Sequence, residues 1–258
     1  LLEGDPVVSS NLGAADLNLA KGWTLVANPL VTIVDKETLN VIYEDESKSW
    51  DDAIIEGWIA PHIIGWFEDT HYPSDQLVPF NGYWFHTSRD LTVEVRPHLA
   101  SDGAARLADN TWSLNIEATP TDGISGGDFI QIGLREDANN EFVYGEDEFD
   151  HPNPGIDSYV DLYFNKTDWI GLEDHRGIMV ESPYFSSDVR SSLDEVQAWD
   201  IEGDLHGVLG NIKLSWTMDD IEGDLHILVA GESINMKEVS FVEVSSLDNI
   251  TVVAGDLN

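Results

Sequence analysis

The sequence predicts an all-β protein made of tandem β-sandwich domains of the immunoglobulin-like or jelly-roll-like type. Short segments rich in β-branched and aromatic residues recur along the chain and are separated by Gly, Pro, Asn and Asp. Helical patterning is confined to residues 51–56. Short strands with regular turn signals are typical of sandwiches.

The strand candidates share period-2 alternation or a short apolar run bounded by turn residues. In residues 91–96 apolar and polar side chains alternate, and Pro97 ends the pattern. The strand candidates are residues 24–27, 31–34, 40–43, 63–67, 82–86, 91–96, 112–118, 129–134, 159–164, 177–181, 195–199, 211–217, 224–230, 239–244 and 249–254.

A small, polar stretch at residues 98–110 reads as a linker and divides the chain. We therefore expect an N-terminal arm at 1–20, a first β domain at 21–98, and a second β region at 99–258 that ends in an immunoglobulin-like sandwich at about 190–258. The arm contains Val7 and Val8 but is too short to fold alone. We expect self-association through terminal strands, with the arm lying against a neighbouring subunit; an arm docked on its own domain is the alternative.

Charge and cysteine content exclude several classes of protein. The net charge of −37 repels nucleic acid and anionic membranes, and it attracts hard cations such as Ca²⁺. No apolar run approaches the roughly 18 residues of a membrane-spanning helix. The absence of cysteine removes disulfides, thiolate catalysis and thiolate metal sites. The opening residues, from Leu1 to Pro6, read as a mature chain whose signal peptide has been removed, which predicts an extracellular or cell-surface location.

Two segments carry a family resemblance. Residues 22–29, closed by residues 81–84, resemble a GWN-L-NP…GYW β module, and residues 211–218 resemble a V-LSW-L immunoglobulin-like domain. Both are found in large secreted proteins of Gram-negative bacteria, notably those exported by the type IX route. The resemblance implies a secreted β protein without a particular activity. The sequence departs from this family in having no basic sorting tail after residues 249–254.

One acidic loop has the spacing of a calcium-binding loop. Asp137, Asn139, Glu141 and Glu148 occupy the oxygen-ligand offsets 1, 3, 5 and 12. Phe142 stands where an EF-hand needs glycine, so a calcium loop between strands is the prediction, and a hydrated acidic loop is the alternative. The heptapeptide DIEGDLH, at residues 200–206 and again at 220–226, places further acids on one strand face.

Aromatic residues offer a second kind of site. The candidates for a carbohydrate-binding face are Trp58, Trp66, Tyr72 and Trp84. Aromatic residues are also common in the cores of β-sandwiches, which is the alternative location for them. The segment Gly123–Gly127 matches the pattern G-x-S-x-G, but its flanks predict a polar loop running into a strand rather than a nucleophile elbow.

These observations predict a non-catalytic extracellular structural protein: a subunit of a self-assembling surface filament, sheath or layer, stabilised by structural Ca²⁺. The alternative is a carbohydrate-binding or adhesion module of a secreted polysaccharide-degrading protein.

Overall fold

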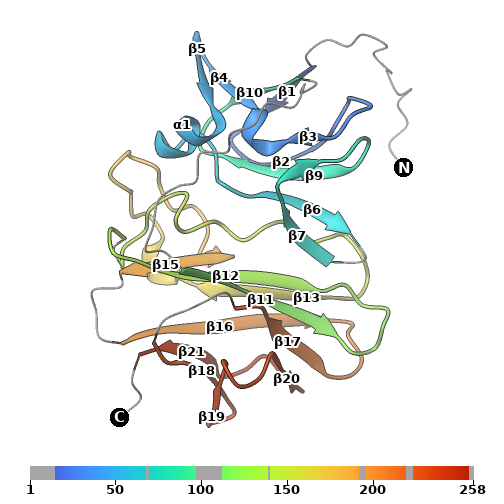
Figure 1. The fold of residues 1–258 in the computed structure, drawn as a ribbon, viewed down its shortest axis with the longest axis vertical. Helices are drawn as coiled ribbons and strands as arrows, with labels where there is room; N and C mark the ends of the chain where they lie inside the picture. Colours follow the sequence, from blue (N-terminus) through green and yellow to red (C-terminus); the bar gives the residue numbers. More distant parts are fainter. Residues whose placement is uncertain are drawn as a thin grey trace. The chain divides into compact units, whose positions relative to one another are not determined.

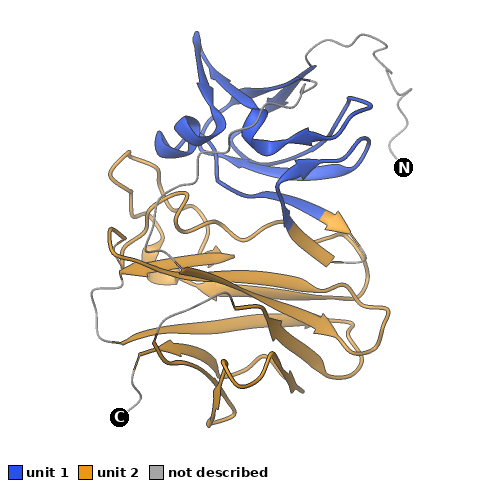
Figure 2. Ribbon diagram, viewed as in Figure 1, with its two compact units in different colours: residues 1–65, 73–106 blue, residues 66–72, 107–258 orange. Residues whose placement is uncertain are grey.

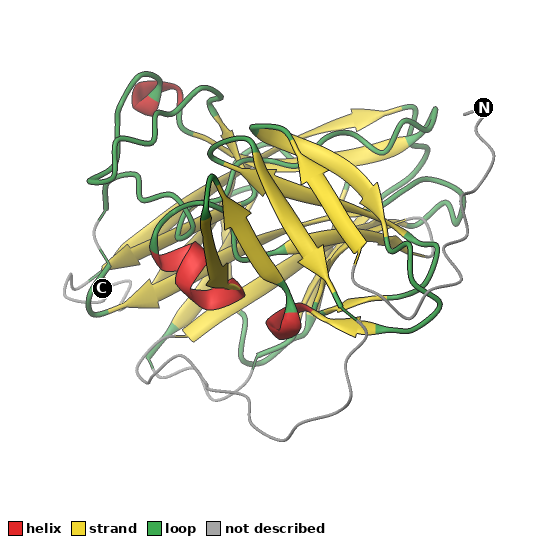
Figure 3. Cartoon of the chain, turned by 90° about the horizontal axis from the view of Figure 1, so that it is seen from above, coloured by secondary structure: helices red, strands yellow, loops and turns green. Residues whose placement is uncertain are grey.

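A computed structural model describes residues 15–67, 70–96, 112–138, 140–191, 196–218 and 223–255. The all-β prediction is confirmed, because strands dominate and the described residues contain one short α-helix and two 3-10 helices (Figure 3). No helix among these residues has the length and apolarity needed to cross a membrane.

The chain divides into two compact units (Figure 2). The first comprises Leu1–Gly65 and Pro73–Arg106, and the second comprises Trp66–Tyr72 and Leu107–Asn258. The sequence-derived boundary follows residue 98, and the division between the units falls after Arg106. The short segment Trp66–Tyr72 was not foreseen, since the sequence placed it in the first domain.

The first unit is built around two four-stranded sheets, in the orders β1-β10-β4-β5 and β2-β9-β6-β7, with a two-stranded β3-β8 sheet. The ends of β6 and β7 that fall within Trp66–Tyr72 belong to the second unit. The elements are β1 (Ala15–Leu19), β2 (Gly22–Ala27), β3 (Val34–Asp35), η1 (Lys36–Thr38), β4 (Asn40–Tyr43), β5 (Glu46–Ser49), α1 (Trp50–Ile55), β6 (Ile63–Phe67), β7 (Thr70–Ser74), β8 (Gln76–Leu77), β9 (Gly82–Thr87) and β10 (Leu91–Val95).

The core of the first unit follows from strand alternation. Along β10, Leu91, Val93 and Val95 are buried while the residues between them are half-buried. They pack in one apolar cluster with Trp50 of α1. The helix begins at Trp50 because Ser49 caps it, its hydroxyl accepting the backbone N–H of Asp52 at 3.2 Å.

The second unit contains a five-stranded sheet, β15-β12-β11-β17-β20, and a six-stranded sheet, β14-β13-β16-β21-β18-β19 (Figure 1). Its pairings are antiparallel except that β12 and β15 run parallel. The elements are β11 (Trp112–Pro120), β12 (Asp128–Arg135), β13 (Tyr159–Asn165), η2 (Thr167–Trp169), β14 (Tyr184–Phe185), β15 (Ser187–Ser191), β16 (Gln197–His206), β17 (Ile212–Trp216), β18 (Leu225–Val229), β19 (Glu232–Asn235), β20 (Phe241–Val244) and β21 (Ile250–Ala254).

Alternating side chains form the core of this unit too. Leu114 and Ile116 of β11, and Trp199 and Ile201 of β16, are almost completely buried, whereas Asp200 between the last two is exposed. Trp216 of β17 is likewise buried, at 5% exposed.

Three local predictions differ from the structure. The end of the proposed arm, Ala15–Leu19, forms β1 and pairs antiparallel with β10, so these residues have a partner within their own sheet. The rest of the arm, residues 1–14, lies outside the described residues. The strand predictions at 31–34 and 177–181 are wrong: only Val34 of the first stretch is in a strand, and Met179 forms a single isolated bridge. Both segments are turn-rich, so their apolar residues were not evidence of strands.

Candidate metal centre

A buried cluster of two histidines and one aspartate lies in the second unit. His71 lies on β7, Asp128 is the first residue of β12, and His151 lies in the long connection between β12 and β13. Their exposed fractions are 4%, 2% and 4%. One ligand atom of each lies within 4.8 Å of the others, so the three can reach a common ion.

The distances within this His71–Asp128–His151 cluster suit a small divalent metal. Asp128 Oδ1 lies 3.1 Å from His151 Nε2 and 3.7 Å from His71 Nδ1, and the two imidazole centroids are 4.2 Å apart. Ligands about 2.0–2.1 Å from a tetrahedral zinc ion lie roughly 3.3 Å from one another. The observed separations are close to that value, so little movement would be needed to coordinate an ion.

Backbone pairing brings two of the three ligands together. Thr70 forms a parallel bridge with Gly127, which sets His71 beside Asp128. A Cβ atom on Gly127 would lie 2.8 Å from the carbonyl oxygen of Ala118, so only glycine allows this approach. Asp128 Oδ2 accepts the backbone N–H of Leu162 at 2.8 Å, which fixes the carboxylate.

The facing atoms of Asp128 and His151 are poorly satisfied by the protein itself. Oδ1 of Asp128 and Nε2 of His151 are buried, and neither has a hydrogen bond of good geometry among the described residues, although they lie 3.1 Å apart. Buried polar atoms without partners are costly and call for an explanation such as a bound ion.

The electrostatics favour a positive charge beside Asp128. Burial alone would raise the pKa of Asp128, but the charge of His151 and hydrogen bonds outweigh it and lower that pKa to about 2. Burial would lower the pKa of His151, but the charge of Asp128 prevails and raises it to about 9. Burial lowers the pKa of His71. Without a metal the cluster is thus an ion pair between Asp128 and protonated His151, and a metal would replace that proton.

Two further carboxylates lie close to Asp128 and form a second group with it, which contains no histidine. Asp128, Asp150 and Asp161 also bring ligand atoms within 4.8 Å of one another, and Asp150 and Asp161 are partly exposed. Burial, aided by the charge of Asp128, raises the pKa of Asp161 to about 6. Burial raises the pKa of Asp150 well above its ordinary range.

The predicted calcium loop is arranged differently. Asp137 is exposed and paired with Arg135, Glu141 is exposed, and Glu148 is buried. Asn139 lies outside the described residues. The described members of this set are not among the groups whose ligand atoms converge within 4.8 Å. Calcium binding by this loop therefore remains a prediction from spacing.

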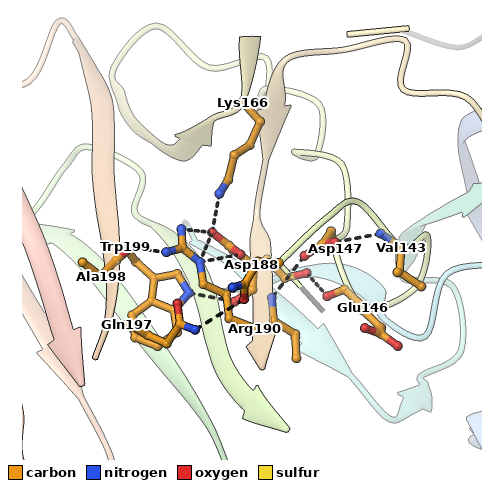
Figure 4. A network of polar contacts seen from close by, with 12 residues as sticks. Val143, Glu146, Asp147, Lys166, Asp188, Arg190, Gln197, Ala198 and Trp199 are labelled. Carbon is orange, nitrogen blue, oxygen red and sulfur yellow. Dashed lines mark hydrogen bonds and ion pairs between the residues drawn. The ribbon is translucent and has the colours of Figure 1, made fainter. Parts of the chain in front are cut away.

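The interior of the same loop forms a closed polar network (Figure 4). Asp147 accepts the backbone N–H groups of Val143 and Val189, at 2.9 and 3.1 Å. Asp188 is paired with Lys166 at 2.6 Å and with Arg190 at 2.8 Å. Asp147 holds the loop against β15 through the amide of Val189, whereas Asp188 joins β15 to Lys166.

The aromatic residues proposed for sugar binding do not form one platform in either unit. Trp58 is 5% exposed, and its ring is covered by the cations of Lys48 and Arg89 at 4.9 and 5.9 Å. Trp66 packs edge-on against His71 at 4.7 Å. Tyr72 and Trp84 are half-buried.

The serine of the G-x-S-x-G pattern is a turn residue. Ser125 donates to Asp122 Oδ2 at 2.6 Å and lies 2.6 Å from Ser158 Oγ. The segment leads into β12 and not into a helix.

Sequence reasoning missed the cluster because its ligands lie far apart in the chain and match no spacing motif. The only local signals were the paired glycines before Asp128 and the adjacent Asp150 and His151. Comparison of the chain with protein-family models, with curated proteins and with solved structures finds no match.

Proposed function

We propose that this chain is a non-catalytic structural protein of an extracellular or cell-surface assembly. We further propose that a divalent transition-metal ion stabilises its second unit by joining separate segments of the chain. The observation that supports the ion is the convergence of His71, Asp128 and His151. Two imidazoles and a carboxylate favour zinc or a neighbouring first-row metal.

The position of the ligands supports a fastening role. They come from three separate segments, one in β7, one at the start of β12 and one in a loop. An ion that joins distant segments stabilises the folded chain, because it binds the folded state and not the unfolded one. The chain has no cysteine, so it has no disulfide for this purpose. The ligands are at most 4% exposed, which suits a structural ion better than a reaction centre.

Assembly through a terminal strand is supported by the place of β1. It is the outer strand of the β1-β10-β4-β5 sheet, and it carries a single charged residue, Asp16. Outer strands with few charges are open to pairing with another chain, and lysine on such a strand opposes pairing.

One experiment tests both parts. The purified full chain is analysed for metal content and for mass by analytical ultracentrifugation across a concentration series. We expect about one equivalent of zinc or a related metal, and assembly that Asp16→Lys weakens while the control Ser47→Lys on β5 does not. A metal-free chain that binds no added zinc contradicts the fastening role. A chain that stays monomeric at every concentration contradicts assembly.

Carbohydrate binding is a second candidate, favoured by a groove of about 290 Å³ on the five-stranded sheet. Its lining is rich in hydroxyl, amide and carboxylate groups, from Ser113, Asn115, Glu117, Ser215, Trp216 and Thr217. Phe241, 46% exposed, pairs with Ser215 in the adjoining strand. A ring beside polar groups suits a sugar. Glycan-array binding that is lost in Glu117→Ala and kept in Trp84→Ala would support this function, and binding unaffected by Glu117→Ala would oppose it.

A further inference from the structure

Asp128 belongs to two ligand sets of different chemistry. With His71 and His151 it offers two nitrogens and one oxygen, and with Asp150 and Asp161 it offers oxygen alone. Nitrogen-containing sets favour transition metals, whereas sets made only of oxygen favour hard cations such as Ca²⁺. The two sets meet at one buried carboxylate.

The all-oxygen set of Asp128, Asp150 and Asp161 concentrates negative charge. Three carboxylate oxygens within 4.8 Å of one another repel unless a proton or a cation lies between them. Asp128 and Asp161 form no ion pair with a lysine or arginine among the described residues. The histidine that faces Asp128 is His151, which would be a ligand of the transition-metal ion.

A second observation points to a ligand at this place. The side chain of Asp128 is 2% exposed, and its Oδ1 atom lacks a hydrogen bond in the described structure. Its other oxygen is fixed by the amide of Leu162. The carboxylate is therefore held with Oδ1 facing the histidines, 3.1 Å from His151 Nε2, where a cation would satisfy it.

We propose that Asp128, Asp150 and Asp161 bind a second ion, a hard divalent cation best matched by Ca²⁺, and that Asp128 is shared with the transition-metal position. Calcium takes six to eight oxygen ligands in flexible geometry, at about 2.3–2.6 Å. Three carboxylates supply part of this shell. Asp161 is half-buried, so water can reach this site and complete the shell.

This inference rests on the proposed function for the shared use of Asp128, but the two ions can be tested separately. The full chain is stripped with EDTA and titrated by isothermal calorimetry with CaCl₂, with MgCl₂ and with ZnCl₂. The variants are Asp161→Asn, Asp150→Asn, His71→Gln and Asp128→Asn. Asp137→Asn is the matched control, because it removes a carboxylate from the acidic loop that sequence spacing selected. Circular dichroism establishes that each variant is folded.

We expect Asp161→Asn and Asp150→Asn each to weaken calcium binding by about tenfold or more and to leave zinc binding nearly unchanged. His71→Gln has the reverse effect, Asp128→Asn weakens both, and Asp137→Asn weakens neither. Calcium binding that survives in His71→Gln while zinc binding fails even in the wild type would support the second site and remove the transition-metal proposal. Calcium binding lost in Asp137→Asn but kept in both Asp150→Asn and Asp161→Asn would overturn the inference, as would equal affinity for magnesium and calcium or the absence of saturable calcium binding.

Discussion

The indole Nε1 of Trp199 donates a hydrogen bond of 3.0 Å to the backbone carbonyl of Asp188, joining β16 to β15 inside the second unit (Figure 4). Trp199 is fully buried, and the guanidinium of Arg190 lies 5.3 Å from its ring. One side chain thus links strands that belong to different sheets.

Replacement of this tryptophan tests that link. Trp199→Phe removes the donor, leaves a buried carbonyl without it, and opens a small cavity. We expect a loss of about 1–3 kcal/mol in the free energy of unfolding, measured by urea denaturation. Trp84→Phe, at a half-buried site on β9, is the control. Equal losses in the two variants would show that the indole hydrogen bond contributes nothing specific.

A pH-dependent effect is expected at Asp122, which caps the turn before β12. Its carboxylate accepts from the hydroxyl of Ser125 at 2.6 Å and from the amides of Ile124, Ser125 and Leu209 at 2.9–3.1 Å. The Ser125 hydroxyl, followed by these amides, holds the pKa of Asp122 well below its ordinary value. A lowered folded-state pKa means that the carboxylate stabilises the fold above the unfolded pKa of about 3.9, and that this contribution is lost as the pH falls toward the folded pKa.

The variant Asp122→Asn should therefore melt below the wild type at pH 7 and pH 5. The gap should narrow below about pH 4, where the carboxylates of the unfolded state are protonated. Differential scanning calorimetry across this range measures it, with Asp157→Asn, an exposed acid, as the control. A gap that stays constant down to pH 2 would mean that the charge of Asp122 is unimportant.

Gly203 is expected to be intolerant of a side chain. A Cβ atom there would lie 2.6 Å from the carbonyl oxygen of Asp161 and 2.6 Å from Leu247 Cδ1. Gly203→Ala should cost roughly 1–3 kcal/mol, because β13 must shift away from β16. Gly82→Ala is the control, since its nearest neighbour would be Leu25 Cδ1 at 3.4 Å. Matching denaturation midpoints for the two variants would contradict the argument from close approach.

Metal loss should destabilise the second unit. A ligand that binds only the folded state adds RT ln(1 + [L]/Kd), about 2.7 kcal/mol at a hundredfold excess over Kd. We expect EDTA-treated protein to regain stability of this order on zinc addition in urea denaturation. The response should be absent in His151→Gln and present in His226→Gln, which changes a histidine on β18. A response in both variants would assign the effect to surface binding.

The sequence predicted the strands better than their partners. Period-2 alternation identified β10 and β11, since one face of each meets a core. The repeated heptapeptide shows the limit: its first copy lies within β16, whereas in the second copy Gly223 has φ +84° and β18 begins only at Leu225. The Gly-Asp pairs at 203–204 and 223–224, both within the described residues, thus adopt different structures because their surroundings differ.

The acids of the first heptapeptide copy illustrate the same limit. Sequence reasoning expected repulsion on one strand face, but neighbouring strands supply donors. Thr251 donates to Asp200 at 2.8 Å, Asn165 to Glu202 at 3.1 Å and Tyr163 to Asp204 at 3.1 Å. The candidate metal ligands could not be recognised in the sequence, because strand pairing brings them together and their spacing in the sequence follows no motif.

The membership of Trp66–Tyr72 in the second unit limits how this protein can be divided or recombined. A gene fragment that begins after the linker would encode most of that unit without His71, and a fragment that ends there would carry His71 away from Asp128 and His151. Duplication, fusion or shuffling at the linker would therefore yield a second unit that lacks His71, one of its candidate metal ligands.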